Sequence, residues 1–303
     1  MPKSASGFEA RTLRRRKRHV LLITVVPLVG FVVAVVMLWR KAVGPLELGL
    51  LAGMWTLSGL AGTVGFHRLF AHRSFQARTS VRVALAVAGS MAGQGPPIYW
   101  AALHRQHHQF SDQEGDPHSP HLFGDSFLAM VRGLWHAHIG WMFRHDLPDS
   151  SRYTPDLLQD PVLAKVNRLY FVWLAIGLAI PAGIGGLVHG SWLGAWYGFL
   201  WGGLARLFLG EHLIWSVNSL CHFFGTRPFR LDDHSANNTW MSVLTMGESL
   251  HNNHHAFPGS ARFGLRWWQL DPGDWLIWSL ERLGLVWGVK RPSKQTIVAR
   301  MAR

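Results

Sequence analysis

Residues 14–41 read RRRKRHVLLITVVPLVGFVVAVVMLWRK, in which a basic cluster precedes twenty residues, 20–39, without a charged side chain. A helix of that length rises by ~30 Å at ~1.5 Å per residue and so spans the hydrocarbon core of a bilayer. A cleaved signal peptide has a shorter apolar core that ends in small residues, whereas this run ends in Trp39, Arg40 and Lys41. We therefore expect an uncleaved membrane helix here.

Three further apolar runs extend this pattern. Residues 48–66 and 169–188 carry no charge, and the run 191–212 stays uncharged until it reaches Arg206, Glu211 and His212. Because charges are costly in lipid, we expect these three near the cytoplasmic interface or facing protein. Short links pair the runs into two antiparallel hairpins.

The predicted fold is therefore an all-α integral membrane protein with one domain, 1–303. Its four transmembrane helices, two hairpins at about 20–39, 48–66, 169–188 and 191–212, lie under a cytosolic helical cap made of 67–168 and 213–303. Both the basic tail 1–19 and the basic segment 290–303 flank apolar or amphipathic sequence, which marks the cytoplasmic side of a cell membrane. We expect both termini in the cytoplasm.

The composition narrows the function classes. The chain has 303 residues, a formal net charge of +13, eighteen histidines against seventeen acids, and one cysteine. A lone Cys221 excludes a disulfide framework and a cysteine-based zinc or iron–sulfur site. The basic residues gather in the two tails rather than over one folded face, which argues against nucleic-acid binding.

Histidines form the second decisive pattern, because nine of them fall in clusters outside the charge-free runs. Positions 1, 4 and 5 of His-x-x-His-His lie within ~100° of one another on a helix, so three imidazoles project from one face. Asn218 lies four residues before one of these histidines and is available as a tenth ligand, directly or through water. The nine histidines are His67, His72, His104, His107, His108, His222, His251, His254 and His255.

Nine imidazoles are too many for one ion, and two metals with four or five nitrogens each is the economical interpretation. His67 and His72 are five residues apart, so they either straddle a helix end or bind different metals. Imidazole suits Zn, Cu, Fe and Ni alike, although structural zinc needs only four ligands. Four carboxylates are candidates to hold the other ring nitrogens: Asp112, Glu114, Asp116 and Glu248.

At these residues, over roughly 60–270, the sequence resembles the membrane fatty-acid desaturases, specifically the delta-9 acyl (stearoyl-CoA-type) desaturases of the bacterial type without a fused electron carrier. The resemblance rests on HRLFAH at 67–72, HRQHH at 104–108, NSLCH at 218–222 and HNNHH at 251–255. It implies two non-haem Fe²⁺ ions held by the nine histidines, with Asn218 reaching one iron through water. It also implies that O₂ is the co-substrate and that a cis double bond is introduced into a saturated acyl chain.

The resemblance also bears on the substrate. It places Trp100 and Trp215 in the wall of a bent acyl tunnel and Arg144 near the phosphates of an acyl-CoA. One departure is that Ala102 and Leu103 stand where animal acyl-CoA members have an Arg-Asp pair. Acyl-CoA remains the favoured substrate, with phospholipid-linked acyl chains as the alternative. Electrons must come from a separate donor, such as a reductase with a ferredoxin-like carrier.

Three other functions compete with this prediction. A bis-histidine haem carrier would place its ligands within the apolar spans, and a metal transporter would line a path across the bilayer. The clustered histidines here gather on one side. A membrane hydroxylase with the same metal pair differs only in the fate of the substrate radical, and only the resemblance favours desaturation over it.

Overall fold

The computed structural model describes residues 3–40, 43–144 and 147–301, and it does not describe the side chains of residues 3–16 and 144. The described residues are mostly helical and include two short strands. The N-terminal half contains α1 (Lys3–Trp39), α2 (Pro45–Ala61), η1 (Gly62–Ala71), β1 (Gln76–Ala77), α3 (Thr79–Ser90), α4 (Pro97–Phe110), α5 (Phe127–Trp135), η2 (His136–Gly140) and α6 (Trp141–Arg144). The C-terminal half contains α7 (Ser150–Tyr153), α8 (Pro155–Leu158), α9 (Pro161–Arg168), α10 (Tyr170–His189), α11 (Trp192–Gly198), η3 (Phe199–Ala205), α12 (Arg206–Leu220), η4 (Thr239–Met241), α13 (His251–Ala256), α14 (Pro272–Arg282), β2 (Val286–Trp287) and α15 (Lys294–Met301).

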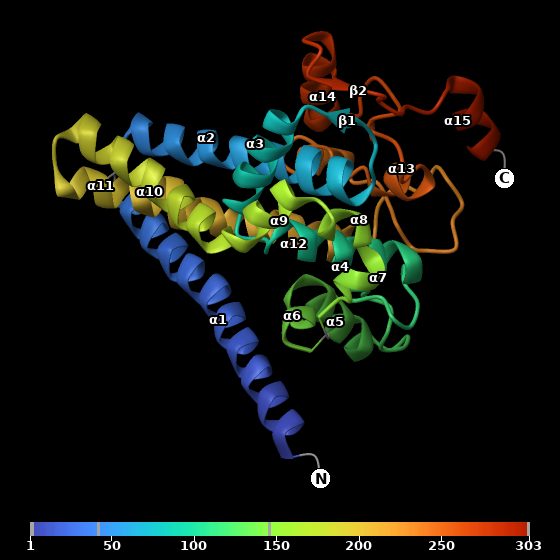
Figure 1. The fold of residues 1–303 in the computed structure, drawn as a ribbon, viewed down its shortest axis with the longest axis horizontal. Coiled ribbons are helices and arrows are strands. Elements are labelled where there is room, and N and C mark those ends of the chain that lie inside the picture. The colour runs from blue at the N-terminus through green and yellow to red at the C-terminus, as the bar shows by residue number, and fades with distance from the viewer. Residues whose placement is uncertain (1–2, 41–42, 145–146, 302–303) are drawn as a thin grey trace.

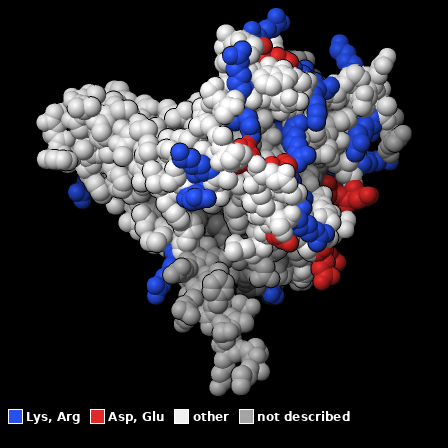
Figure 2. Space-filling view, viewed as in Figure 1, with Lys and Arg blue, Asp and Glu red and all other residues white. Residues whose placement is uncertain are grey.

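Among the described residues, three helical segments are long and apolar enough to cross a membrane. They are Lys17–Trp39, Pro45–Ala71 and Tyr170–His189, in agreement with three of the four predicted runs. Their apolar side chains are largely exposed on the isolated chain, with Val29 56% and Val32 53% accessible on α1. Such surfaces suit contact with lipid rather than with water. In Figure 2 the part of the molecule that carries α2, α10 and α11 shows few charged side chains. The opposite part, which carries α13, α14 and α15, shows many.

The fourth predicted run, 191–212, is also helical. Here α11, η3 and α12 follow one another without a break from Trp192 to Leu220, and the run turns back alongside α10, which precedes it (Figure 1). The two arms of this hairpin touch through glycines, since a Cβ at Gly185 would lie 2.3 Å from the carbonyl oxygen of Gly194. Small residues let helix backbones approach this closely.

Charged side chains within this hairpin face protein, as predicted. Arg206 and Glu211 are each 1% exposed. The Arg206 guanidinium donates to the carbonyl oxygens of Met91 at 2.5 Å and of Gly202 and Gly177 at 3.2 Å each. The main-chain oxygens therefore stabilise its charge and keep it away from lipid.

Helix α1 departs from the expected hairpin packing. Figure 1 shows it running diagonally away from α2 rather than lying along it. Its contacts are instead with the fourth helical run, where Ala34 is buried in a cluster with Leu200 and Trp201 of η3. Phe31 stacks on Phe208 of α12 with ring centroids 4.4 Å apart. The short link after α1 therefore does not by itself produce a packed pair.

A buried ion pair joins the helical bundle to the C-terminal part of the cap. Arg68, in η1, is fully buried and binds Asp271 through two hydrogen bonds of 2.7 and 3.1 Å. The same guanidinium donates to the carbonyl oxygen of Ala261 at 2.8 Å and lies 3.8 Å from the ring centre of Phe263. Asp271 also accepts from the Phe263 amide at 2.7 Å. This clamp fixes the helix that carries His67 against the segment that follows α13.

Candidate metal centre

The nine histidines expected from the sequence come together in two adjacent clusters. We call site A the group His67, His72, His104, His108 and His254, and site B the group His107, His222, His251 and His255. Within each site one ring nitrogen per residue lies within 4.8 Å of all the others. The ligand nitrogens come from η1 and the residue that follows it, from α4, from the turn that follows α12 and from α13. Each His-x-x-His-His helix supplies both sites.

The π-helical geometry of η1 explains how one site holds both His67 and His72. The amide of His72 donates to the carbonyl oxygen of His67 at 3.0 Å, a bond that spans five residues. Such a bond marks a π turn and puts residues five apart one above the other. The two rings lie 4.9 Å apart and face the same centre. The two residues straddle the end of η1, and both lie in site A rather than in different sites.

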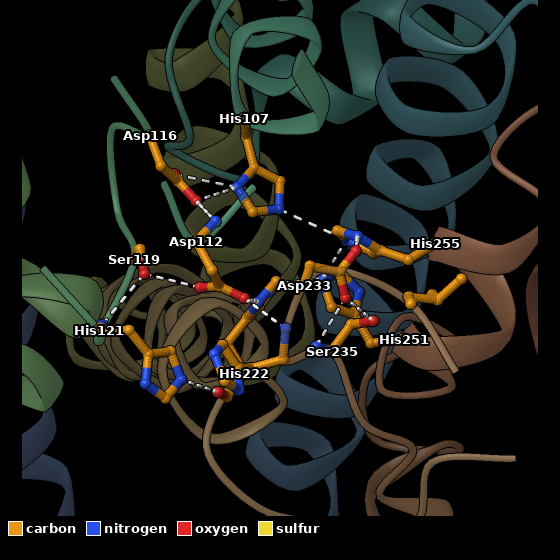
Figure 3. Close-up of polar contacts among 12 residues, drawn as sticks. His107, Asp112, Asp116, Ser119, His121, His222, Asp233, Ser235, His251 and His255 are labelled. Carbon is orange, nitrogen blue, oxygen red and sulfur yellow. Dashed lines mark hydrogen bonds and ion pairs between the residues drawn. The ribbon is translucent and has the colours of Figure 1, made fainter. Parts of the chain in front are cut away.

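Carboxylates fix the orientation of four of these rings. His107 Nδ1 lies 3.0 Å from Asp116, His222 Nδ1 lies 2.8 Å from Asp112, and His255 Nδ1 lies 2.9 Å from Asp233 (Figure 3). In site A, His67 Nδ1 contacts Glu248. Three of these carboxylates were expected from the sequence, whereas Glu114 is exposed and Asp233 was missed.

The facing ring nitrogens fit a bound cation. A neutral imidazole carries one proton, so a ring that donates from Nδ1 has only a lone pair at Nε2. The Nε2 atoms of His107, His222 and His255 lie 2.9–3.4 Å from other Nε2 atoms of site B. His107 and His255 both donate from Nδ1, so their Nε2 lone pairs face each other at 3.4 Å and repel unless a cation lies between them. Metal–imidazole bonds of about 2.0–2.1 Å place neighbouring ligand nitrogens roughly 3 Å apart, as observed here.

Burial keeps these rings in the neutral form that a metal requires. It lowers the pKa of most of them, and neighbouring rings lower it further; the affected rings are His72, His104, His108, His251, His254 and His255. His222 is the exception, since burial lowers its pKa but the Asp112 carboxylate more than offsets this and raises it.

An apolar cavity reaches the two sites. The outer cavity, of about 330 Å³, is lined by Trp100, Trp215 and Asn218, together with His19 and Phe171 at the starts of two candidate spans. Trp100 stacks on His104 with ring centroids 5.0 Å apart. The structure thus brings both predicted tunnel tryptophans and Asn218 to one cavity beside site A. The side chain of Arg144 lies outside the described part of the chain.

A second cavity, of about 70 Å³ and called here the inner cavity, continues from the outer cavity and shares Trp100, His104 and Asn218 with it. Its wall follows one face of the continuous helix made of α2 and η1, because the lining residues are spaced three or four apart. They are Trp55, Ser58, Gly59, Gly62, Thr63, Phe66 and His67. The cavity therefore runs from site A along the helix towards Trp55.

A mostly helical chain with candidate membrane helices, histidine clusters able to hold two metal ions and an adjoining apolar cavity has the features of a membrane-associated metalloenzyme with an apolar substrate. Comparison with known proteins identifies the family. The sequence pattern described as Fatty acid desaturase matches residues 41–285, and the chain belongs to this family. It is therefore an oxidoreductase of lipid metabolism. The family uses a di-iron centre.

The relatives act on different forms of acyl substrate. The chain is 49% identical over 285 residues to a Hex-5-enoyl-[acyl-carrier protein] acetylenase of Moorena producens, covering 93% of this chain and 89% of that protein. It is 38% identical to an sn-1 stearoyl-lipid 9-desaturase of Anabaena variabilis, covering 80% and 82%. It is 36% identical to an Acyl-CoA C20 Delta5-desaturase of Anemone leveillei, covering 80% and 73%.

Proposed function

We propose that this protein introduces a cis double bond into a saturated fatty acyl chain, using O₂ and two irons held in sites A and B. The observation that carries the proposal is the apolar cavity whose wall includes His67, His104 and His251, three of the nine converging imidazoles. Bound iron would supply the oxidising power that no side chain has, so that an acyl chain, O₂, two electrons and two protons yield the alkene and two waters.

The chain's own residues position the substrate. Trp100 lies in both cavities, so its ring stands where the acyl chain passes His104, and it fixes the path past the metals. Asn218 lines both cavities and is proposed to reach one iron through water. The apolar lining excludes bulk water from the reacting carbons. Carboxylates behind His67, His107, His222 and His255 hold the Nε2 atoms of these four rings towards the ions.

We also propose four membrane crossings, with the run 191–212 as the fourth and both termini in the cytoplasm. The burial of Arg206 among main-chain oxygens supports this arrangement, because it keeps the guanidinium of this run out of contact with lipid. The histidine sites then lie in the cytosolic cap, 67–168 and 213–303, close to the ends of the spans.

For the acyl carrier we propose a thioester, either acyl-CoA or acyl-carrier protein, with delta-9 as the expected position. Support comes from the relatives named as acting on acyl-carrier protein and on acyl-CoA. The relatives named as lipid desaturases make a phospholipid-linked chain the alternative to test.

The test is a reconstituted assay with purified iron-loaded protein, a ferredoxin and its reductase. Matched stearoyl-CoA, stearoyl-carrier protein and stearoyl-phosphatidylcholine are offered separately, and the products are analysed by mass spectrometry after derivatisation of double bonds. We expect an alkene from a thioester, no product from His254→Ala, and wild-type product from His189→Ala. His189 is a suitable control because it lies outside both sites, paired with Glu47 at 2.9 Å. A hydroxylated product without an alkene would contradict the proposal.

A further inference from the structure

One exposed loop of the cap contacts the hydrogen-bond partners of site B. The loop is residues 223–234, between α12 and η4, and its last residue, His234, is exposed. The His234 amide donates to Asp112 Oδ2 at 2.8 Å, and the same oxygen lies 2.8 Å from His222 Nδ1. A single carboxylate therefore separates this surface residue from a ring of site B.

Aromatic rings also lie between the protein surface and His222. His121 Nε2 lies 2.6 Å from the carbonyl oxygen of His222, and Figure 3 shows the two residues adjacent. The His121 ring stacks on His234 with centroids 4.0 Å apart, and on Phe223 with centroids 6.3 Å apart. Phe223 and its neighbour Phe224 are 39% and 45% exposed. A short stack of rings thus leads from the protein surface to His222.

A second connection runs through the same loop. The Arg227 guanidinium donates to the carbonyl oxygens of Leu231, at 3.2 Å, and of Asp233. The Asp233 carboxylate in turn lies 2.9 Å from His255 Nδ1. Both connections end at site B. By contrast, the carboxylate of site A, Glu248, is buried and borders the acyl cavity.

The surface beside the loop is basic and hollowed. Two cavities border the loop and α15: the larger, of about 630 Å³, is also lined by residues 265–269, and the smaller has about 330 Å³. Four exposed arginines line them: Arg227 and Arg266 in the larger cavity, Arg230 and Arg300 in the smaller. On the loop, Asp233 is engaged by His255, which leaves Asp232 as its exposed acid. Figure 2 shows basic side chains gathered over the region of α15.

We propose that the 223–234 loop, with His121 and these four arginines, is the docking surface for a small acidic one-electron carrier protein, and that electrons enter at site B. This inference rests on the proposed function, which consumes two electrons per double bond. Each reduced carrier would give one electron to a ferric ion of the pair and leave oxidised, so two dockings balance one turnover. Positive charge around an exposed aromatic contact gives fast, salt-sensitive encounter with an acidic partner.

The first test measures binding alone, so it does not depend on activity. A plant-type [2Fe–2S] ferredoxin is immobilised, and binding of the detergent-purified protein is followed by biolayer interferometry at several salt concentrations. We expect Arg230→Glu/Arg300→Glu to weaken binding by about tenfold and to flatten its salt dependence. Arg282→Glu, an exposed control on α14, should bind as wild type. Unchanged binding by the double variant would overturn the docking surface.

The second test separates electron transfer from chemistry. Stopped-flow absorption follows reduction of the diferric protein by reduced ferredoxin and, in parallel, by dithionite. We expect Phe223→Ala to slow reduction by ferredoxin several-fold and to leave reduction by dithionite unchanged. Equal rates with ferredoxin, or equal slowing with both reductants, would contradict the route. If the desaturase proposal itself failed, the binding test would still judge the surface, because it uses no substrate or O₂.

Discussion

Asp112 offers the sharpest test of how the two sites are held. Its carboxylate accepts from His222 Nδ1 at 2.8 Å, from Ser119 Oγ at 2.6 Å and from the His234 amide at 2.8 Å. Burial raises the pKa of Asp112, but the neighbouring His222 and these hydrogen bonds more than reverse this and hold the pKa below its usual range. Asp112 is therefore ionised, and Asp112→Asn removes a charge and one acceptor without changing the shape.

The expected loss is confined to one ion. Removing a partner that orients a metal-bound imidazole costs about 10–100-fold in metal affinity, or roughly 1.4–2.8 kcal/mol. Asp112 holds a ring of site B, so Asp112→Asn should lose the iron of that site first. Glu248→Gln should instead weaken site A, because Glu248 contacts His67.

The assay is iron content during titration with a chelator, combined with Mössbauer spectroscopy of ⁵⁷Fe-loaded protein. Wild type should release both irons over one range. Each variant should fall to about one iron per chain at chelator concentrations that leave wild type intact, with different remaining spectra in the two variants. Simultaneous loss of both irons in Asp112→Asn, or retention of both at wild-type affinity, would refute the assignment of Asp112 to a separate site.

Three further predictions concern the clamp, pH and the inner cavity. Arg68→Met leaves the buried Asp271 unpaired and should lower the free energy of unfolding in detergent by about 3–5 kcal/mol, with recovery in Arg68→Met/Asp271→Leu, as measured by chemical denaturation. Burial lowers the pKa of His104, His251 and His254 in the fold below the value of 6.5 that holds in the unfolded chain. The contribution of these three rings to the stability of the metal-free protein should therefore be present above about pH 6.5 and be lost as the pH drops below it; a thermal midpoint that rises on acidification would contradict this sign. Trp55→Ala should extend the inner cavity and raise the ratio of longer to shorter acyl products in the reconstituted assay, whereas an unchanged ratio would place the end of the chain elsewhere.

Local patterns in the sequence were sufficient to predict that the clustered histidines come together. The spacing of His104, His107 and His108 places three rings on one face of α4, and the structure shows that face turned to the centre. Three of the predicted runs also match helices long enough to cross a membrane. Both properties depend on helical periodicity and apolar length, which neighbouring residues determine.

Features that depend on distant contacts could not be predicted. A regular helix would separate His67 from His72, and only the π-helical turn of η1 brings them together. Asp233 lies in an exposed loop without a motif, and it reaches His255 because Arg227 shapes the loop backbone. The diagonal course of α1 follows from its packing on η3, which a short link to α2 does not reveal.

The central claim is that the two histidine clusters hold two irons beside an acyl cavity. Its most direct test is a structure of the iron-loaded protein with anomalous difference maps collected on both sides of the iron absorption edge. Two iron peaks are expected, one surrounded by the Nε2 atoms of site A and the other by those of site B. A single peak, peaks of another metal in iron-replete protein, or ions bound away from both clusters would contradict it.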